Sequence, residues 1–119
     1  MITLPLPQDV RAQAEAALQT HCDLRASVFV RDDVRFEVVL RGDAATIYER
    51  QFLSSGDGGG VWSRLAVAQF RFDAGTRRWT LHWADRSSRW HVYDDLKPSK
   101  KCEELIAEVD ADPTGIFWG

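Results

Sequence analysis

Residues 34–41 read VRFEVVLR, and the alternation of side-chain types along this stretch decides the fold. One side of the alternation is apolar and consists of Val34, Phe36, Val38 and Leu40. The other side is mostly charged and consists of Arg35, Glu37, Val39 and Arg41. Successive side chains of a β-strand point to opposite faces of a sheet, so the pattern predicts a strand with one buried face. The turn sequence RGDA at 41–44 then predicts that a second strand returns over residues 45–53.

Three further strands are predicted downstream and are separated by short hairpin connections. They span residues 61–72, 78–84 and 89–93. The glycine-rich segment SSGDGGG at 54–60 is interpreted as a flexible hairpin loop, because glycine and serine restrain the backbone little. These segments together predict a roughly five-stranded antiparallel meander.

Two helices are predicted, one on each side of the strands in the sequence. The N-terminal helix spans residues 7–22 and the C-terminal helix runs from Pro98 to about Asp110, with Ser99 as its N-cap. Residues 23–33 form a connector whose structure is left open, with a short extended piece over 27–30 as one alternative. Each helix carries one apolar stripe, so both are expected to pack on one face of the sheet. The prediction is a single α+β domain over residues 1–119, with the apolar ending IFWG docked on the sheet or its helix.

Composition indicates an ordinary globular protein. The chain has 119 residues, of which 45% are hydrophobic and 28% charged, and its net charge is -3. The two cysteines, Cys22 and Cys102, are far apart and form no metal or disulfide pattern, so they are expected to be reduced and buried. We expect a cytoplasmic protein without a membrane partner, because there is neither a signal sequence nor a run of about 18 apolar residues.

Arginine is concentrated between residues 61 and 91. This segment contains six arginines and two aspartates, which gives it a local charge of +4. The rest of the chain therefore carries a charge of -7. The arginines are interleaved with aromatic residues, namely Trp62, Phe70, Phe72, Trp79 and Trp90. This combination is typical of surfaces that bind single-stranded nucleic acid, on which aromatic rings stack on the bases and arginines contact the phosphates. The negative overall charge argues against that function as the first choice.

The last two strands can be placed in register if a two- or four-residue loop joins them. This register pairs Trp83 with Trp90 on a core-facing side, and His82 with His91 on the opposite side together with Thr80 and Tyr93. Two opposed imidazoles suggest metal binding or acid–base chemistry. Two ligands do not make a metal site, so no metal, cofactor or catalytic residue is assigned.

Four segments carry a resemblance to a known family. They are FRF at 70–72, WTLHW at 79–83, RWHVY at 89–93 and DPTGIFWG at 112–119. The chain resembles a family of small bacterial proteins known as domain of unknown function 3024, from the first helix onward. The resemblance implies a single domain and brings no activity, cofactor or catalytic residue with it.

For function, the sequence favours a non-catalytic binding or protein-interaction module, because no nucleophile, base and orienting group converge. The first alternative is single-stranded nucleic-acid binding through the arginine- and aromatic-rich hairpins. The second is a metal-assisted or acid–base enzyme around His82 and His91. The candidate binding residues are Arg71, Arg77, Arg78, His82, Arg89, His91 and Tyr93.

Overall fold

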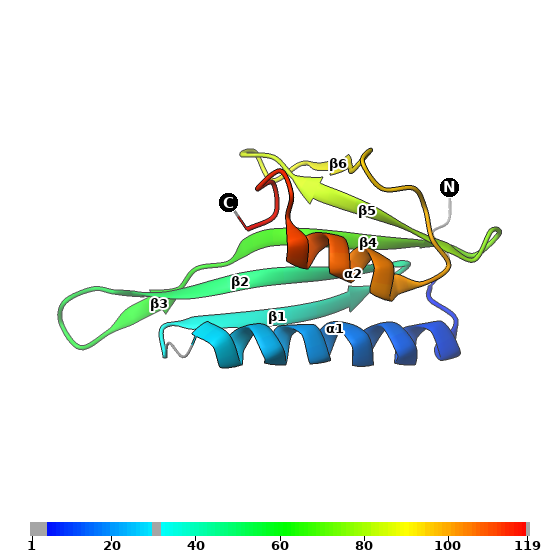
Figure 1. Ribbon diagram of the computed structural model, residues 1–119. Coiled ribbons are helices and arrows are strands. Elements are labelled where there is room, and N and C mark those ends of the chain that lie inside the picture. Colours follow the sequence, from blue (N-terminus) through cyan, green and yellow to red (C-terminus); the bar gives the residue numbers. More distant parts are fainter. Residues whose placement is uncertain (1–4, 30–31, 119) are drawn as a thin grey trace.

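The predicted antiparallel meander is present, as a six-stranded sheet with two helices (Figure 1). The computed structural model describes residues 5–29 and 32–118. The strands are β1 (Val34–Arg41), β2 (Ala44–Ser54), β3 (Gly60–Trp62), β4 (Leu65–Asp73), β5 (Arg78–Ala84) and β6 (Trp90–Val92). Their order in the sheet is β1-β2-β4-β5-β6, and β3 pairs with the far end of β2. The single strand predicted over 61–72 is therefore two strands, separated at Ser63 and Arg64.

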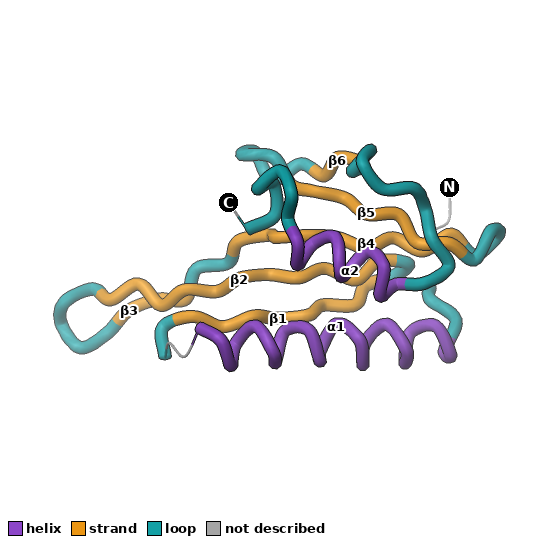
Figure 2. The backbone as a smooth tube through the Cα atoms, in the orientation of Figure 1, coloured by secondary structure: helices purple, strands orange, loops and turns teal. Residues whose placement is uncertain are grey.

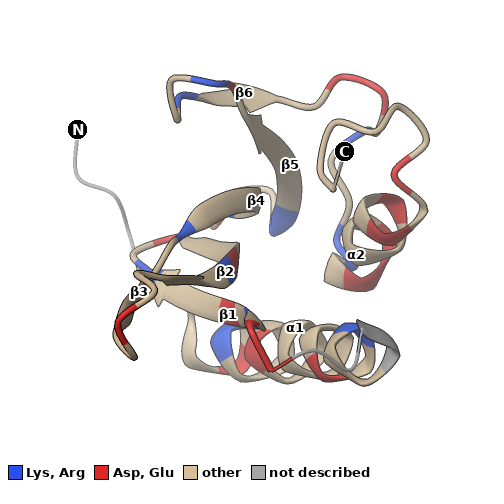
Figure 3. Ribbon diagram, turned by 90° about the vertical axis from the view of Figure 1, so that its left-hand side faces the viewer, with Lys and Arg blue, Asp and Glu red and all other residues tan. Residues whose placement is uncertain are grey.

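Both helices lie on one side of the sheet, as predicted. Figure 3 shows α1 (Gln8–Phe29) beside β1 and α2 (Cys102–Ala111) beside β4 and β5, and neither of these helices lies on the opposite side. The fold is thus α+β with a helical layer over one face only. Alternate strand residues consequently face either that layer or the uncovered side.

The first helix is longer than predicted. It continues past Cys22 to Phe29, because the following residues, DLRASVF, contain neither glycine nor proline to end it. Of the connector left open, residues 27–29 are helical, not extended, and Val30 lies outside the described residues.

The second helix begins later than predicted, at Cys102, and Ser99 is not its N-cap. Ser99 instead forms a backbone bridge with Trp79, with N–H···O distances of 2.7 and 3.0 Å. Its hydroxyl accepts a hydrogen bond from the amide of Lys101 and donates one to Glu104. The bridge holds Ser99 in an extended conformation, so the helix starts only after Lys101, whose φ and ψ are also extended.

The core lies between the helical layer and the sheet. Its fully buried side chains include Leu18 of α1, Leu105 and Val109 of α2, and Ile47, Phe70 and Leu81 of the sheet. Cys22 and Cys102 are free thiols within the two apolar stripes, and both are buried, as predicted. Burial raises the pKa of these thiols to about 11 and about 12, respectively.

The C-terminal segment is docked, as the apolar ending predicts. Phe117 is 6% exposed and its ring lies 5.1 Å from that of Tyr93. Trp118 meets Phe36 of β1 edge to face, and the guanidinium of Arg25 lies 3.4 Å from the centre of the indole. Asp112 fixes this segment, because its carboxylate accepts the amides of Phe117 and Trp118 at 3.0 and 2.9 Å.

One part of the sheet projects beyond the helices. The ribbon of β2 and β3 with the loop 55–59, here called the arm, extends past the end of β1 (Figure 2), and the molecule measures 52 × 29 × 29 Å. Gly60 allows the arm to close, because a Cβ atom there would overlap the ring of Phe52 and lie 2.6 Å from the carbonyl oxygen of Leu53.

Candidate functional site

The uncovered side of the sheet, which we call the open face, holds the most distinctive group of side chains. Phe36 and Val38 of β1 pack toward the core, so Arg35 and Glu37 face away from the helices. Residues paired directly across neighbouring strands share a face, which extends the assignment to the rest of the sheet. The side chains of the open face larger than alanine are Arg35, Glu37, Val39 and Arg41 (β1), Thr46, Tyr48, Arg50 and Phe52 (β2), Trp62 (β3), Arg64, Gln69, Arg71 and Asp73 (β4 and the residue before it), Arg78, Thr80 and His82 (β5), and Trp90 and Val92 (β6).

Aromatic rings and guanidinium groups lie against one another on this face. The guanidinium carbon of Arg64 lies 3.8 Å from the centre of the Tyr48 ring. On the arm, Phe52 and Trp62 are paired across the strands with their ring centres 5.5 Å apart, and Arg35 lies 4.3 Å from the indole centre. Such cation–π contacts hold the arginine side chains flat on the sheet.

The open face carries a clear excess of positive charge. It holds six arginines and two acidic residues, Asp73 and Glu37, and Glu37 bonds Arg64 at 2.8 Å and Arg50 at 3.6 Å. Among the described residues no carboxylate pairs with Arg35, Arg41 or Arg71, so their charges are not neutralised within the protein. Glu37 therefore offsets only part of the positive charge.

A hydrogen-bonded row orients Arg71. Gln69 donates to the hydroxyl of Thr46 at 3.0 Å, and its carbonyl oxygen accepts from Nε of Arg71 at 2.6 Å. Within the described residues the two terminal nitrogens of the Arg71 guanidinium make no hydrogen bond. Arg71 is thus held by its Nε and presents its outer edge, the geometry that binds an anion with two parallel bonds.

His82 belongs to the same row and is buried. The residue is only 5% exposed, and Nε2 of its ring lies 2.9 Å from the hydroxyl oxygen of Thr80. Burial, with a smaller contribution from the charge of Arg71, lowers the pKa of His82 to about 4. The imidazole is therefore neutral at pH 7.

Acidification should destabilise the protein through His82. Its pKa is about 4 in the folded state and ordinarily 6.5, so the unfolded chain binds more protons between these values. The contribution of His82 is fully present above pH 6.5 and is lost as the pH falls toward 4. We expect the free energy of unfolding to fall by about 2 kcal/mol between pH 7.5 and 5.0 because of this group. In urea titrations the His82→Gln variant should lose less stability over that range, and an equal loss in both proteins would contradict the assignment.

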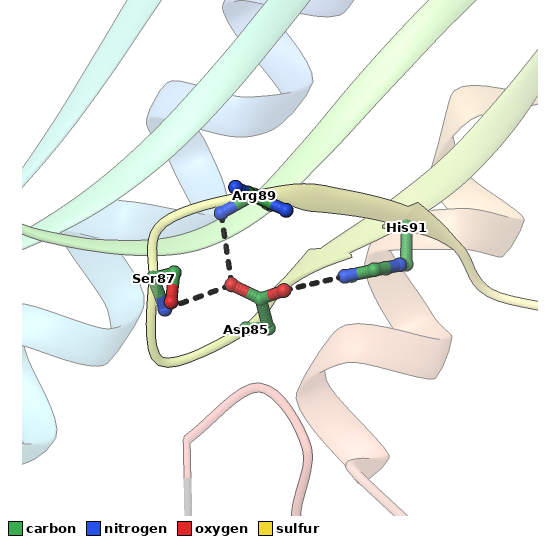
Figure 4. Close-up of polar contacts among 4 residues, drawn as sticks. All are labelled: Asp85, Ser87, Arg89 and His91. Atoms are coloured by element: carbon green, nitrogen blue, oxygen red, sulfur yellow. Dashed lines mark hydrogen bonds and ion pairs between the residues drawn. The ribbon is translucent and has the colours of Figure 1, made fainter.

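The turn between β5 and β6 differs from the predicted one. It is a three-residue loop closed by Asp85 and Arg89, with Ser88 in the left-handed region at φ 61°. Figure 4 shows how Asp85 sets this turn, by accepting the amides of Ser87 and Arg89 at 2.8 and 3.0 Å and bonding Nε2 of His91 at 2.7 Å. The bonds from His91 and the amide of Arg89 lower the pKa of Asp85 below its usual value.

This turn shifts the register by one residue, so the predicted pairs are wrong. Trp83 pairs with His91, and His82 pairs with Val92. A shift of one residue exchanges the faces of a strand. His82 and His91 consequently lie on opposite faces, and the two tryptophans do as well. Trp83 packs against the core and stacks on His91, with ring centres 4.6 Å apart.

Tyr93 is also on the other face from the one predicted. It lies on the core side, is 4% exposed, and donates a hydrogen bond of 2.7 Å to Glu108 of α2. Burial and this bond raise its pKa to about 12. Tyr93 thus joins the sheet to α2 and does not accompany His82.

The predicted arginines are not gathered in one place. Arg71 is on the open face, whereas Arg77 lies in the turn before β5 and pairs with Asp9 of α1 at 3.3 Å. Arg78 begins β5 opposite Asp73, at the end of the open face, and Arg89 belongs to the turn before β6. Of the five interleaved aromatics, Phe70, Phe72 and Trp79 are buried in the core, and only Trp62 and Trp90 reach the open face.

The residues that the prediction missed come from the first two strands. Arg35 and Arg41 are visible in the alternation of residues 34–41, but they lie outside the arginine-rich segment. Tyr48 and Phe52 occupy alternate positions of β2 on the same face as Thr46. The antiparallel pairing of β1 with β2 is the signal that places both sets together.

The chain belongs to the family Domain of unknown function (DUF3024), whose pattern matches residues 6–119. No curated protein and no solved structure matches it. In residues 5–29 and 32–118, no three histidine, cysteine, aspartate or glutamate side chains are grouped to hold a metal ion. Neither of the described helices is long and apolar enough to cross a membrane.

Proposed function

We propose that this protein is a non-catalytic binding module that takes an anionic partner on the open face. The observation that supports the proposal is that Arg35, Arg41 and Arg71 have no carboxylate partner among the described residues and lie on a sheet face that neither α1 nor α2 covers. Arg71 contributes most, because Gln69 orients its guanidinium and leaves the outer edge exposed to a ligand. Positive charge concentrated on one face also attracts anionic partners from a distance.

An enzyme built on the two histidines is not our proposal. The metal and acid–base alternatives depend on His82 and His91 lying together, and the two side chains are on opposite faces. His82 is buried against Thr80, and His91 is bonded to Asp85 in the turn.

We also infer a cytoplasmic location. The support is that Cys22 and Cys102 are both free thiols in the core, and disulfide-free proteins are the rule in reducing compartments.

A protein partner is a second candidate, favoured by the other side of the arm. Leu53, Val61 and Leu65 share the side opposite Phe52 and Trp62, and they are 52%, 66% and 60% exposed. Exposed apolar side chains that are grouped in this way often mark protein contacts. This surface lies apart from the open face and would serve a different partner.

The proposed function is tested with inorganic polyphosphate, a linear polyanion without rings. At low ionic strength we expect it to shift the backbone amide resonances of the open-face residues in β1, β2 and β4, and to leave α2 unchanged. The Arg71→Gln variant should weaken binding, whereas Arg11→Gln, the same charge change on an exposed position of α1, should not. An absence of binding, or shifts confined to the helices, would contradict the proposal.

A further inference from the structure

We infer that the anionic partner is single-stranded nucleic acid, an inference that rests on the proposed function. The observation that supports this inference is that aromatic rings and arginines alternate on the open face of the sheet. Phosphates complement the unpaired guanidinium groups, and bases complement the rings.

The rings distinguish nucleic acid from other anions. An acidic peptide or a simple phosphate needs only the arginines and would leave Tyr48, Phe52, Trp62 and Trp90 without a role. Tyr48, Trp62 and Trp90 are partly exposed and Phe52 is 37% exposed, although rings of this size are ordinarily covered. Every base has a flat face, so four accessible rings suit a chain of bases whatever its sequence.

The arginines and the rings form composite platforms. Arg35 on Trp62 and Arg64 on Tyr48 each lie within 4.5 Å of a ring centre, at 4.3 and 3.8 Å. A guanidinium held in this way keeps its second flat face for a base. Arg35 also keeps its N–H edge for a phosphate, whereas Arg64 is bonded to Glu37 at 2.8 Å. The Arg35 platform can therefore contact a nucleotide at two points, and the Arg64 platform offers a flat face for a base.

The rings also mark a path across the face. Phe52 lies four residues beyond Tyr48 on β2, about 14 Å along the strand. Trp90 lies opposite Ala84 of β5, close to the level of Tyr48 but three strands away, which is again about 14 Å. The path runs from β6 across Tyr48 to the arm, and its total length suits several nucleotides, as in other single-strand binding domains.

A single strand fits this face better than a duplex. The bases of a duplex are stacked and paired, so their flat faces are not available to rings on a sheet. Recognition of a duplex usually requires an element that enters a groove, commonly a helix. Both helices of this fold lie on the other side of the sheet.

The test is a titration of the full chain with a labelled oligodeoxythymidine and an oligouridine of about 12 nucleotides, at low and moderate salt. We expect binding of at least one strand that weakens steeply with salt, because each neutralised phosphate releases counterions. Trp62→Ala should weaken binding about 10- to 100-fold, and Trp62→Phe should retain most of it. Arg35→Gln combined with Arg71→Gln should reduce the salt slope by about 1.4.

The controls separate the effect of the open face on binding from the effect of the overall charge of the protein. Arg11→Gln combined with Arg77→Gln also removes two positive charges, from an exposed position of α1 and from a residue paired with Asp9, and it should leave affinity and slope unchanged. An abasic oligonucleotide of equal length should bind at least about 10-fold more weakly than the thymidine strand. Circular dichroism and urea unfolding of Trp62→Ala should show that the variant is folded.

The outcomes distinguish this inference from the proposed function. If the abasic strand, polyglutamate or polyphosphate binds as tightly as the oligonucleotides, the module binds anions but the nucleic-acid inference is wrong. Tighter binding of a duplex than of either single strand would also overturn it. If no anion binds at low salt, both proposals fail.

Discussion

Trp79→Ala should lower the free energy of unfolding by about 3–5 kcal/mol, the largest effect of any substitution considered. Trp79 is 3% exposed, and its ring lies 5.0 Å from that of Phe72 within the core. The substitution removes a large buried surface and leaves a cavity, because the surrounding strands and α2 cannot collapse fully. The backbone bridge from Trp79 to Ser99 also places the start of α2, so the variant should weaken that junction too.

Trp90→Ala is the matched control, because it removes the same side chain from the open face. Trp90 is partly exposed, so its removal should cost about 1 kcal/mol or less in the same urea titration. Equal losses for the two variants would contradict the assignment of faces in β5 and β6.

Asp112→Ala should lower the free energy of unfolding by about 2–3 kcal/mol. Its carboxylate accepts the amides of Phe117 and Trp118, and neither amide has an alternative partner in the described structure. Asp112 also ends α2 with φ 42° and ψ 58°, a left-handed conformation that aspartate tolerates better than alanine. Loss of the bonds should release the C-terminal segment, which faster hydrogen exchange at Phe117 would report.

Asp112→Asn separates the two contributions. Asparagine accepts the left-handed conformation and keeps one side-chain carbonyl, so it should recover about half of the lost stability. Wild-type stability and slow exchange in Asp112→Ala would show that the apolar contacts of Phe117 and Trp118 alone hold the segment.

The faces of the first strands were predictable from the sequence, and the register of the last hairpin was not. In residues 34–41 the alternation of apolar and charged side chains assigns each residue to a face without knowledge of the turn. For β5 and β6 the faces depend on whether the loop has an odd or an even number of residues. Asp85 and the left-handed conformation of Ser88 close the loop with three residues. Serine rarely adopts a positive φ, so the residue type does not indicate this loop length in the sequence.

The candidate site was predictable only in part for a related reason. Arg71 was identified because it lies in the arginine-rich segment, whereas Arg35 lies far from that segment in the sequence and reaches the same face through the pairing of β1 with β2 and β4. A count of charges along the sequence cannot predict a surface whose arginines come from distant segments. Antiparallel pairing, which interleaves residues from distant segments, has to be known first.

The docking of Trp118 on Arg25 and Phe36 has a consequence for how the chain is made. The strands pair mostly with neighbours in the sequence, so the sheet can form early during synthesis. The contact between Arg25 and Trp118 joins residues that are far apart in the sequence, and it forms only after Trp118 has left the ribosome. Until then Phe36 lacks the indole that packs against it, and the nascent protein carries an unfinished apolar surface that a chaperone can recognise.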